Sequence, residues 1–164
     1  MMPVPPETPP TKLESMPPQS SDCSQAAERL ARYFQSLSAA SVAELGHYYA
    51  PDARFKDPFN AVQGVPAIAA IFRHMFATLE QPHFVITGQV LQGQQCFMTW
   101  EFRFRFRRFS VEQPQVILGA SQLVFSPQGL VTMHRDYWDA AEELYEKLPL
   151  VGGLMRWLKR RASH

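Results

Sequence analysis

The sequence predicts an α+β domain, in which helices pack on the concave side of a cone-shaped, curved antiparallel sheet. Two observations carry this prediction. Up to residue 79 the apolar residues recur with the spacing of a helix, and after Pro82 they alternate with polar residues as in a strand. Long alternating strands twist and curl more readily than they lie flat. A curled sheet that helices cover encloses a space, and a ligand would enter at its mouth.

The composition fits one domain of this kind. The chain has 164 residues, 46% of them hydrophobic and 12% aromatic, with a formal net charge of +1. So small a charge argues against a polyanion-binding surface, and we expect no nucleic-acid partner. No apolar run approaches membrane-spanning length, and the N-terminus lacks the pattern of a secretory signal. Two cysteines outside any metal or redox spacing favour a cytoplasmic protein, and neither a metal nor another cofactor is expected.

Three segments are expected along the chain. Residues 1–22 hold seven of the 14 prolines and are predicted to be a disordered tail, because proline and serine contribute little to a core. Residues 23–147 form the domain. Residues 148–164 are predicted to be a helical extension, whose basic end is expected to close the cone; binding to a membrane surface is the less favoured alternative.

The predicted helices come first. Asp22 or Ser24 caps the first helix, whose apolar face includes Tyr33. Ser41 caps a second, shorter helix that extends through Tyr49, so that the acid in KDPF falls just past its end. Gly64 and Pro66 open the third helix, and Pro82 ends it.

The strands are predicted over 83–91, 97–109, 115–126 and 130–139, with a turn at SPQG before the last one. The segment 97–109 gives the clearest signal, because its even positions from 98 to 106 are apolar and its odd positions from 99 to 107 are polar and mostly charged. Its arginines therefore lie on the face opposite the rings. We expect a solvated or subunit-facing surface there, since no base could stack where its phosphate is bound.

Two runs of sequence resemble a known superfamily. They are ARYFQSLSAASVAELGHYYAPDARFKDPF (31–59) and LVFSPQGLVTMHRDYWD (123–139). The chain is similar to members of the nuclear transport factor 2-like superfamily, which includes SnoaL-like polyketide cyclases, ketosteroid isomerases and limonene-epoxide hydrolases. The resemblance covers about residues 24–139 and implies the cone-shaped fold. It also implies a homodimer formed through the outer face of the sheet.

The resemblance to ketosteroid isomerases implies a first set of site residues. Tyr33 matches the tyrosine of the first helix, and Asp57 matches the aspartate of an Asp–Pro turn. The position of the second acid falls on Ser121, which cannot replace a protonated carboxylic acid as a donor. Trp138 matches a tryptophan that lines the cavity.

The resemblance to SnoaL-like cyclases implies a second set, an aspartate near the end of the sheet with a histidine nearby. His134 and Asp136 fit this pattern, and period 2 puts them on one face of their strand with Thr132 and Trp138. Substrate contacts are expected from Trp138, Trp100, Phe59 and Ser121.

These residues leave two functions open. One is an isomerase or cyclase that binds a small apolar carbonyl compound, with Asp57 as base, Tyr33 as donor to the carbonyl oxygen, and His134 and Asp136 assisting or replacing them. The other is a ligand-binding or interaction domain without turnover. In that case Asp57 caps a turn, Tyr33 belongs to the core, and the histidine and its neighbouring acid satisfy each other.

Overall fold

The computed structural model describes residues 20–107 and 114–140. The elements in chain order are α1 (Ser20–Gln35), the 3-10 helix η1 (Ser41–His47), β1 (Tyr49–Lys56), β2 (Ala61–Gln63), α2 (Val65–Thr78), β3 (Leu79–Gln92), β4 (Gln95–Phe106), β5 (Gln115–Phe125) and β6 (Val131–Tyr137). The expected proline-rich tail, apart from its last three residues, and the expected C-terminal helical extension lie outside the described residues. In the described ranges, no helix is long and apolar enough to cross a membrane.

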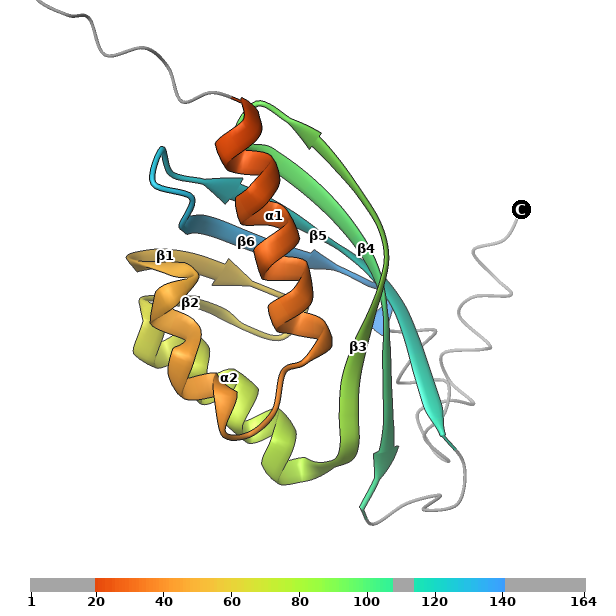
Figure 1. Cartoon of the computed structure of the whole chain (residues 1–164). Coiled ribbons are helices and arrows are strands. Elements are labelled where there is room, and N and C mark those ends of the chain that lie inside the picture. Colours follow the sequence, from red (N-terminus) through yellow and green to blue (C-terminus); the bar gives the residue numbers. More distant parts are fainter. Residues whose placement is uncertain (1–19, 108–113, 141–164) are drawn as a thin grey trace, which may run out of the picture.

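The predicted fold class is confirmed. The six strands form one sheet in the order β2-β1-β6-β5-β4-β3, and the long strands β3 and β4 arch over the helices, which lie on the concave side (Figure 1). Register shifts interrupt the pairing of β3 with β4 at two places, and such bulges bend a strand and increase its twist. The prediction of an antiparallel sheet is wrong at one place, because β1 pairs with β6 in parallel.

The segment around Tyr49 differs from the prediction. The second helix stops at His47, and β1 begins at Tyr49. Within β1, Ala53 and Phe55 are buried while Arg54 is exposed, which is the alternation of a strand. Pairing with β6 and β2 outweighs the helical spacing of the preceding residues, so Asp57 follows a strand rather than a helix.

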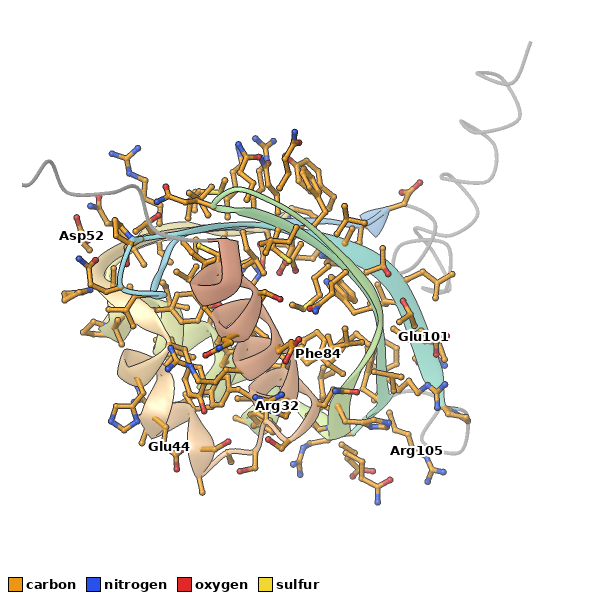
Figure 2. All side chains as sticks on the ribbon, turned by 45° about the horizontal axis from the view of Figure 1, so that its top comes forward. Arg32, Glu44, Asp52, Phe84, Glu101 and Arg105 are labelled. Atoms are coloured by element: carbon orange, nitrogen blue, oxygen red, sulfur yellow. The ribbon has the colours of Figure 1, made fainter. Side chains whose placement is uncertain are left out.

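The alternation predicted for β4 is confirmed. Met98, Trp100 and Phe102 are buried, whereas Arg103 and Arg105 are exposed. Figure 2 shows Phe84 of β3 pointing into the arch, and Glu101 and Arg105 on its outer side. The space under the sheet is therefore walled by rings, and the charged groups face away from it.

α1 and α2 lie near their predicted positions, but Pro82 does not end α2, because the helix ends at Thr78 and Pro82 lies within β3. α1 begins at Ser20, ahead of both expected caps, and α2 begins at Val65 with a proline in its first turn. Gly64, which precedes α2, has a φ of 91°, a conformation that residues with a Cβ rarely adopt. The main core lies between the helices and strands β1, β4, β5 and β6, and its members include Leu30, Ile68 and Leu123.

Candidate functional site

A cavity of about 390 Å³ opens between α2 and the sheet. Phe and Trp rings make up most of its wall, and its polar side chains are few. They are Asp57, His74, Thr78 and Asp136. A second, much smaller hollow of about 20 Å³ lies deeper, lined in part by Ser121, His134 and Asp136. Such a size suits about one water molecule. Apolar walls with a few convergent polar groups are typical of sites for small organic ligands.

Asp136 of β6 is held from two sides at the deep end of this cavity. His134 Nε2 lies 2.7 Å from Asp136 Oδ1, and Ser121 Oγ donates to the same oxygen at 2.5 Å. Within the described residues, Oδ2 of Asp136 has no hydrogen-bond partner, and the side chain is 17% exposed. One carboxylate oxygen is therefore fixed by the protein, and the other is available to a ligand.

The sheet explains why these three side chains meet. His134 and Asp136 are two residues apart on one strand, so they point to the same face. In the register of β5 with β6, Ser121 lies opposite Asp136 and Leu123 lies opposite His134. Side chains directly opposite on one face lie within contact distance, so the antiparallel pairing itself brings the serine to the carboxylate.

Trp100 fixes the serine from the other side. Its Nε1 donates to Ser121 Oγ at 2.9 Å, so the hydroxyl proton is directed to Asp136. The indole reaches across the neighbouring strand above Gly119, where an added Cβ would lie 2.3 Å from the Cη2 atom of the ring. Only glycine leaves room for the ring, which is the role of a glycine where another group approaches a strand closely.

His134 is 3% exposed and sits in an aromatic surrounding. The rings of Phe55 and Phe34 contact the imidazole edge-on, with centroid separations of 5.0 and 5.8 Å. Its Nδ1 lies 2.5 Å from the hydroxyl of Tyr49, which is fully buried at the start of β1. Burial, together with the negative charge of Asp136, raises the pKa of Tyr49 well above its ordinary value, so the phenol keeps its proton.

Asp57 lines the same cavity, but its carboxylate is used locally. Oδ1 accepts from the backbone N–H of Phe59 at 2.7 Å and from that of Asn60 at 2.5 Å. The side-chain amide of Asn60 donates to both oxygens. This is an Asx turn, the arrangement that the turn interpretation of the sequence describes. The expected role of Asp57 as base stays a prediction.

Tyr33 does not line the cavity. Its hydroxyl donates to the backbone carbonyl of Ser41 at 2.9 Å, and its ring stacks on Tyr48 with a centroid separation of 4.1 Å. The side chain is 4% exposed, and burial raises the pKa of the phenol. In this structure Tyr33 is a core residue with a satisfied hydroxyl, and the expected donation to a substrate carbonyl has no geometric support.

The structure therefore brings only part of the predicted set together. Trp138 and Phe59 pack edge-on at the rim of the cavity, with their ring centroids 5.3 Å apart. Trp100 forms part of the cavity wall. Ser121, expected to contact substrate, lies below the wall with its hydroxyl between Trp100 and Asp136.

Two residues of the site, Tyr49 and Gly119, are not among those that the sequence predicts. The sequence predicts Tyr49 on a helix face, and its contact with His134 joins positions 85 residues apart. Gly119 is an isolated glycine inside a predicted strand, a pattern that indicates close approach of another group. The glycine indicates where another group comes close, but it does not show that this group is the indole of Trp100.

Comparisons with known proteins agree with this architecture. A family model for the SnoaL-like domain matches residues 30–134. No curated protein gives a significant match. Among solved structures, one named as a SnoaL-like polyketide cyclase, from Jannaschia sp. CCS1, has a TM-score of 0.64 at 16% identity, covering 76% of this chain and 92% of its own.

Two further structures have the same fold. A protein from Catenulispora acidiphila with a ketosteroid isomerase-like fold, in complex with trimethylamine, gives a TM-score of 0.62 at 17% identity, covering 73% of this chain and 89% of its own. An LEH-like epoxide hydrolase from M. tuberculosis gives 0.60 at 14% identity, covering 85% and 97%. At such identities the likeness shows the fold alone. The family match spans most of the chain, which therefore belongs to the SnoaL-like domain family.

Proposed function

We propose that the protein is an isomerase or cyclase that needs no cofactor and moves a proton at the carbon next to a carbonyl group of a small, largely apolar substrate. Asp136 is the base. The proton passes from the carbon to Oδ2 of Asp136, and the electron pair of the broken C–H bond forms an enolate. Return of the proton to another carbon completes an isomerisation. In a cyclisation the enolate carbon attacks a second carbonyl group, and the oxygen of that group takes the proton from Asp136.

One observation carries this proposal, the asymmetry of the Asp136 carboxylate. Oδ1 accepts from Ser121 and His134, which fixes the orientation of the group before any ligand binds. Oδ2 has no partner in the described part of the chain, and the residue lines the apolar cavity. A general base needs both a fixed position and a lone pair within reach of the substrate.

The same network also favours a rival function, a ligand-binding domain without turnover. An enolate oxygen needs a donor, and the buried donors near the cavity are already engaged. Trp100 N–H bonds to Ser121, Ser121 O–H bonds to Asp136, and Tyr33 O–H bonds to Ser41. Of the cavity-lining side chains described, His74 on α2 and the indole N–H of Trp138 remain as sources of a donor, because the Thr78 hydroxyl already donates to the carbonyl of His74.

Hydrogen–deuterium exchange at carbon tests the proposal without knowledge of the natural product. The protein is incubated in D₂O with a panel of small apolar ketones and 1,3-diketones, and deuterium uptake next to the carbonyl is followed by mass spectrometry. We expect exchange above the buffer rate with the wild type. Asp136→Asn should lower that rate by about 10²- to 10⁴-fold, the usual contribution of a general base.

Asp57→Asn is the matched variant, because it changes the other carboxylate of the cavity to the same neutral amide. We expect its exchange rate to stay within about threefold of the wild type, since Asn retains an acceptor for the turn. The reverse pattern would make Asp57 the base. If neither change affects exchange while the ketones still quench Trp fluorescence, the binding-domain alternative holds.

We further propose that a second copy of the chain binds to the outer face of the sheet. Large apolar side chains are exposed there on three adjacent strands. They are Val90, Phe97, Val116 and Leu118. In the strand register Val90 pairs with Phe97, and the last two pair with charged outer residues of β4, so all four share one face. Leu118→Lys should shift the molar mass in light scattering from dimer to monomer; an unchanged mass would refute this.

A further inference from the structure

The hydroxyl of Tyr49 is the starting point for a second inference about this site. Tyr49 is 0% exposed, and its hydroxyl has one hydrogen-bond partner among the described residues, His134 Nδ1 at 2.5 Å. A buried hydroxyl left without an acceptor for its proton costs about 1–3 kcal/mol. The phenol hydrogen therefore points at Nδ1, and Nδ1 must offer a lone pair to accept it.

The other imidazole nitrogen faces the opposite requirement. His134 Nε2 lies 2.7 Å from Oδ1 of Asp136, a group that can only accept when ionised. A bare Nε2 would turn its lone pair toward those of the carboxylate, which is repulsive. The proton must therefore lie on Nε2, and Ser121 Oγ at 3.2 Å is placed to share it.

The two requirements together define one state of the ring. Asp136 demands a proton on Nε2, and Tyr49 demands that Nδ1 carry none. The edges of Phe34 and Phe55 pack against the imidazole and hold the ring in this orientation. The high pKa of Tyr49 adds to this, since the phenol stays a donor.

We propose that Tyr49 is a positioning residue that holds His134 as the neutral imidazole with its proton on Nε2. His134 then orients Asp136 through an N–H bond without placing a full positive charge beside it. An imidazolium in the same place would stabilise the carboxylate and make it a poorer proton acceptor. The link to turnover rests on the proposed role of Asp136 as base, whereas the state of the ring does not.

Nitrogen NMR of the full-length protein tests the inference directly. Histidine labelled with ¹⁵N is incorporated, and long-range ¹H–¹⁵N correlations report which ring nitrogen carries the proton. The signals of His134 are identified by their loss in His134→Gln. We expect wild-type spectra to show a protonated Nε2 and a bare, hydrogen-bonded Nδ1 at pH 7. A proton on Nδ1 in the wild type, in either the neutral or the charged ring, would overturn the proposal.

Two variants separate a specific from a general effect. Tyr49→Phe removes only the hydroxyl, and the Nδ1 resonance of His134 should move because its donor is gone. Tyr33→Phe is the matched control, since it removes a buried hydroxyl in the same core that bonds to the backbone of Ser41 instead. An unmoved Nδ1 resonance in Tyr49→Phe, or an equal change in Tyr33→Phe, would refute the role of Tyr49.

Turnover supplies an independent readout. In the carbon exchange assay, Tyr49→Phe should lower the rate by about three- to tenfold, the worth of one hydrogen bond, while Tyr33→Phe should leave it unchanged. If the wild type catalyses no exchange but the ring shows the expected state, the proposed function fails and the inference about Tyr49 stands. If exchange depends on Asp136 but Tyr49→Phe moves neither the resonance nor the rate, the inference alone fails.

Discussion

Asp57 and Asp136 line the same cavity, yet the chain holds them in different ways. The partners of Asp57 are two and three residues further along the chain, in its own turn. Asp136 is held by Ser121, 15 residues away on the neighbouring strand, and by a histidine whose other nitrogen bonds to Tyr49 of β1. The first acid serves a local turn, whereas the second depends on three strands being correctly paired.

This difference bears on which acid can act on a ligand. A carboxylate that saturates the amides of its own turn fixes the backbone, and moving it would break that turn. At Asp136 the fold itself engages one oxygen, and the second has no hydrogen-bond partner among the described residues. The two acids should therefore respond differently to the same substitution, in stability as well as in exchange rate.

The largest contrast is expected from alanine at each acid. Asp136→Ala leaves the Nε2–H of His134 and the hydroxyl of Ser121 without their acceptor in a buried place, which should lower the free energy of unfolding by about 3 kcal/mol. Asp57→Ala removes the carboxylate that caps one turn near the surface, and it should lower the free energy of unfolding by about 1 kcal/mol. Urea unfolding followed by circular dichroism measures both values. Equal losses of free energy would show that the two carboxylates contribute equally to stability.

A methyl group at Gly119 should disturb the deep site alone. The new Cβ would lie 2.3 Å from the indole of Trp100, so the ring must leave its place beside Ser121. Overpacking of this kind costs about 1–3 kcal/mol, and we expect about 2 kcal/mol together with a changed Trp fluorescence. Gly46→Ala serves as the control, because the nearest atom there is 4.0 Å away. An unchanged Trp fluorescence spectrum in Gly119→Ala would contradict the position of the Trp100 indole above Gly119.

Alkaline pH should weaken the deep region through its buried tyrosine. Burial raises the folded-state pKa of Tyr49, so below about pH 10 both states hold the proton and the full stability is present. Above about pH 10 the unfolded chain loses the proton while the folded one keeps it, and stability falls by at most about 1.4 kcal/mol per pH unit from this residue. Tyr49→Phe should make the melting temperature fall less steeply between pH 9 and 11. An unchanged slope would show that Tyr49 does not contribute to the loss of stability at alkaline pH.

Much of the fold was predictable from local patterns. The alternation in 97–109 and the helical spacing in 64–79 reflect burial on one face, which the order of the residues records directly. β1 was not predictable in this way, because Tyr48 and Tyr49 continue the spacing of a helix, and pairing with β6 decides the outcome. The parallel direction of that pair is likewise a property of the whole sheet.

The site shows the same division. The shared face of His134 and Asp136 follows from period 2. Trp138 and Trp100 line the cavity, and their contact with a substrate stays a prediction. The bond of Tyr33 to Ser41 and that of Tyr49 to His134 were out of reach, since each depends on where a hydroxyl ends after the helix and sheet have packed. A pattern of residue types shows which face is buried, and it cannot rank one buried tyrosine over another.

The smallest effect on stability is expected at the rim of the cavity. Phe59 is 51% exposed and contacts Trp138 edge-on, so Phe59→Ala should change the free energy of unfolding by less than about 0.5 kcal/mol. In this variant an apolar ligand that enters past residue 59 loses an aromatic contact worth about 0.5–1.5 kcal/mol, which corresponds to a dissociation constant about two- to twelvefold higher. Titration with the neutral dye Nile red measures that constant. A large loss of stability with unchanged affinity would show that the rim supports the fold and that ligands enter elsewhere.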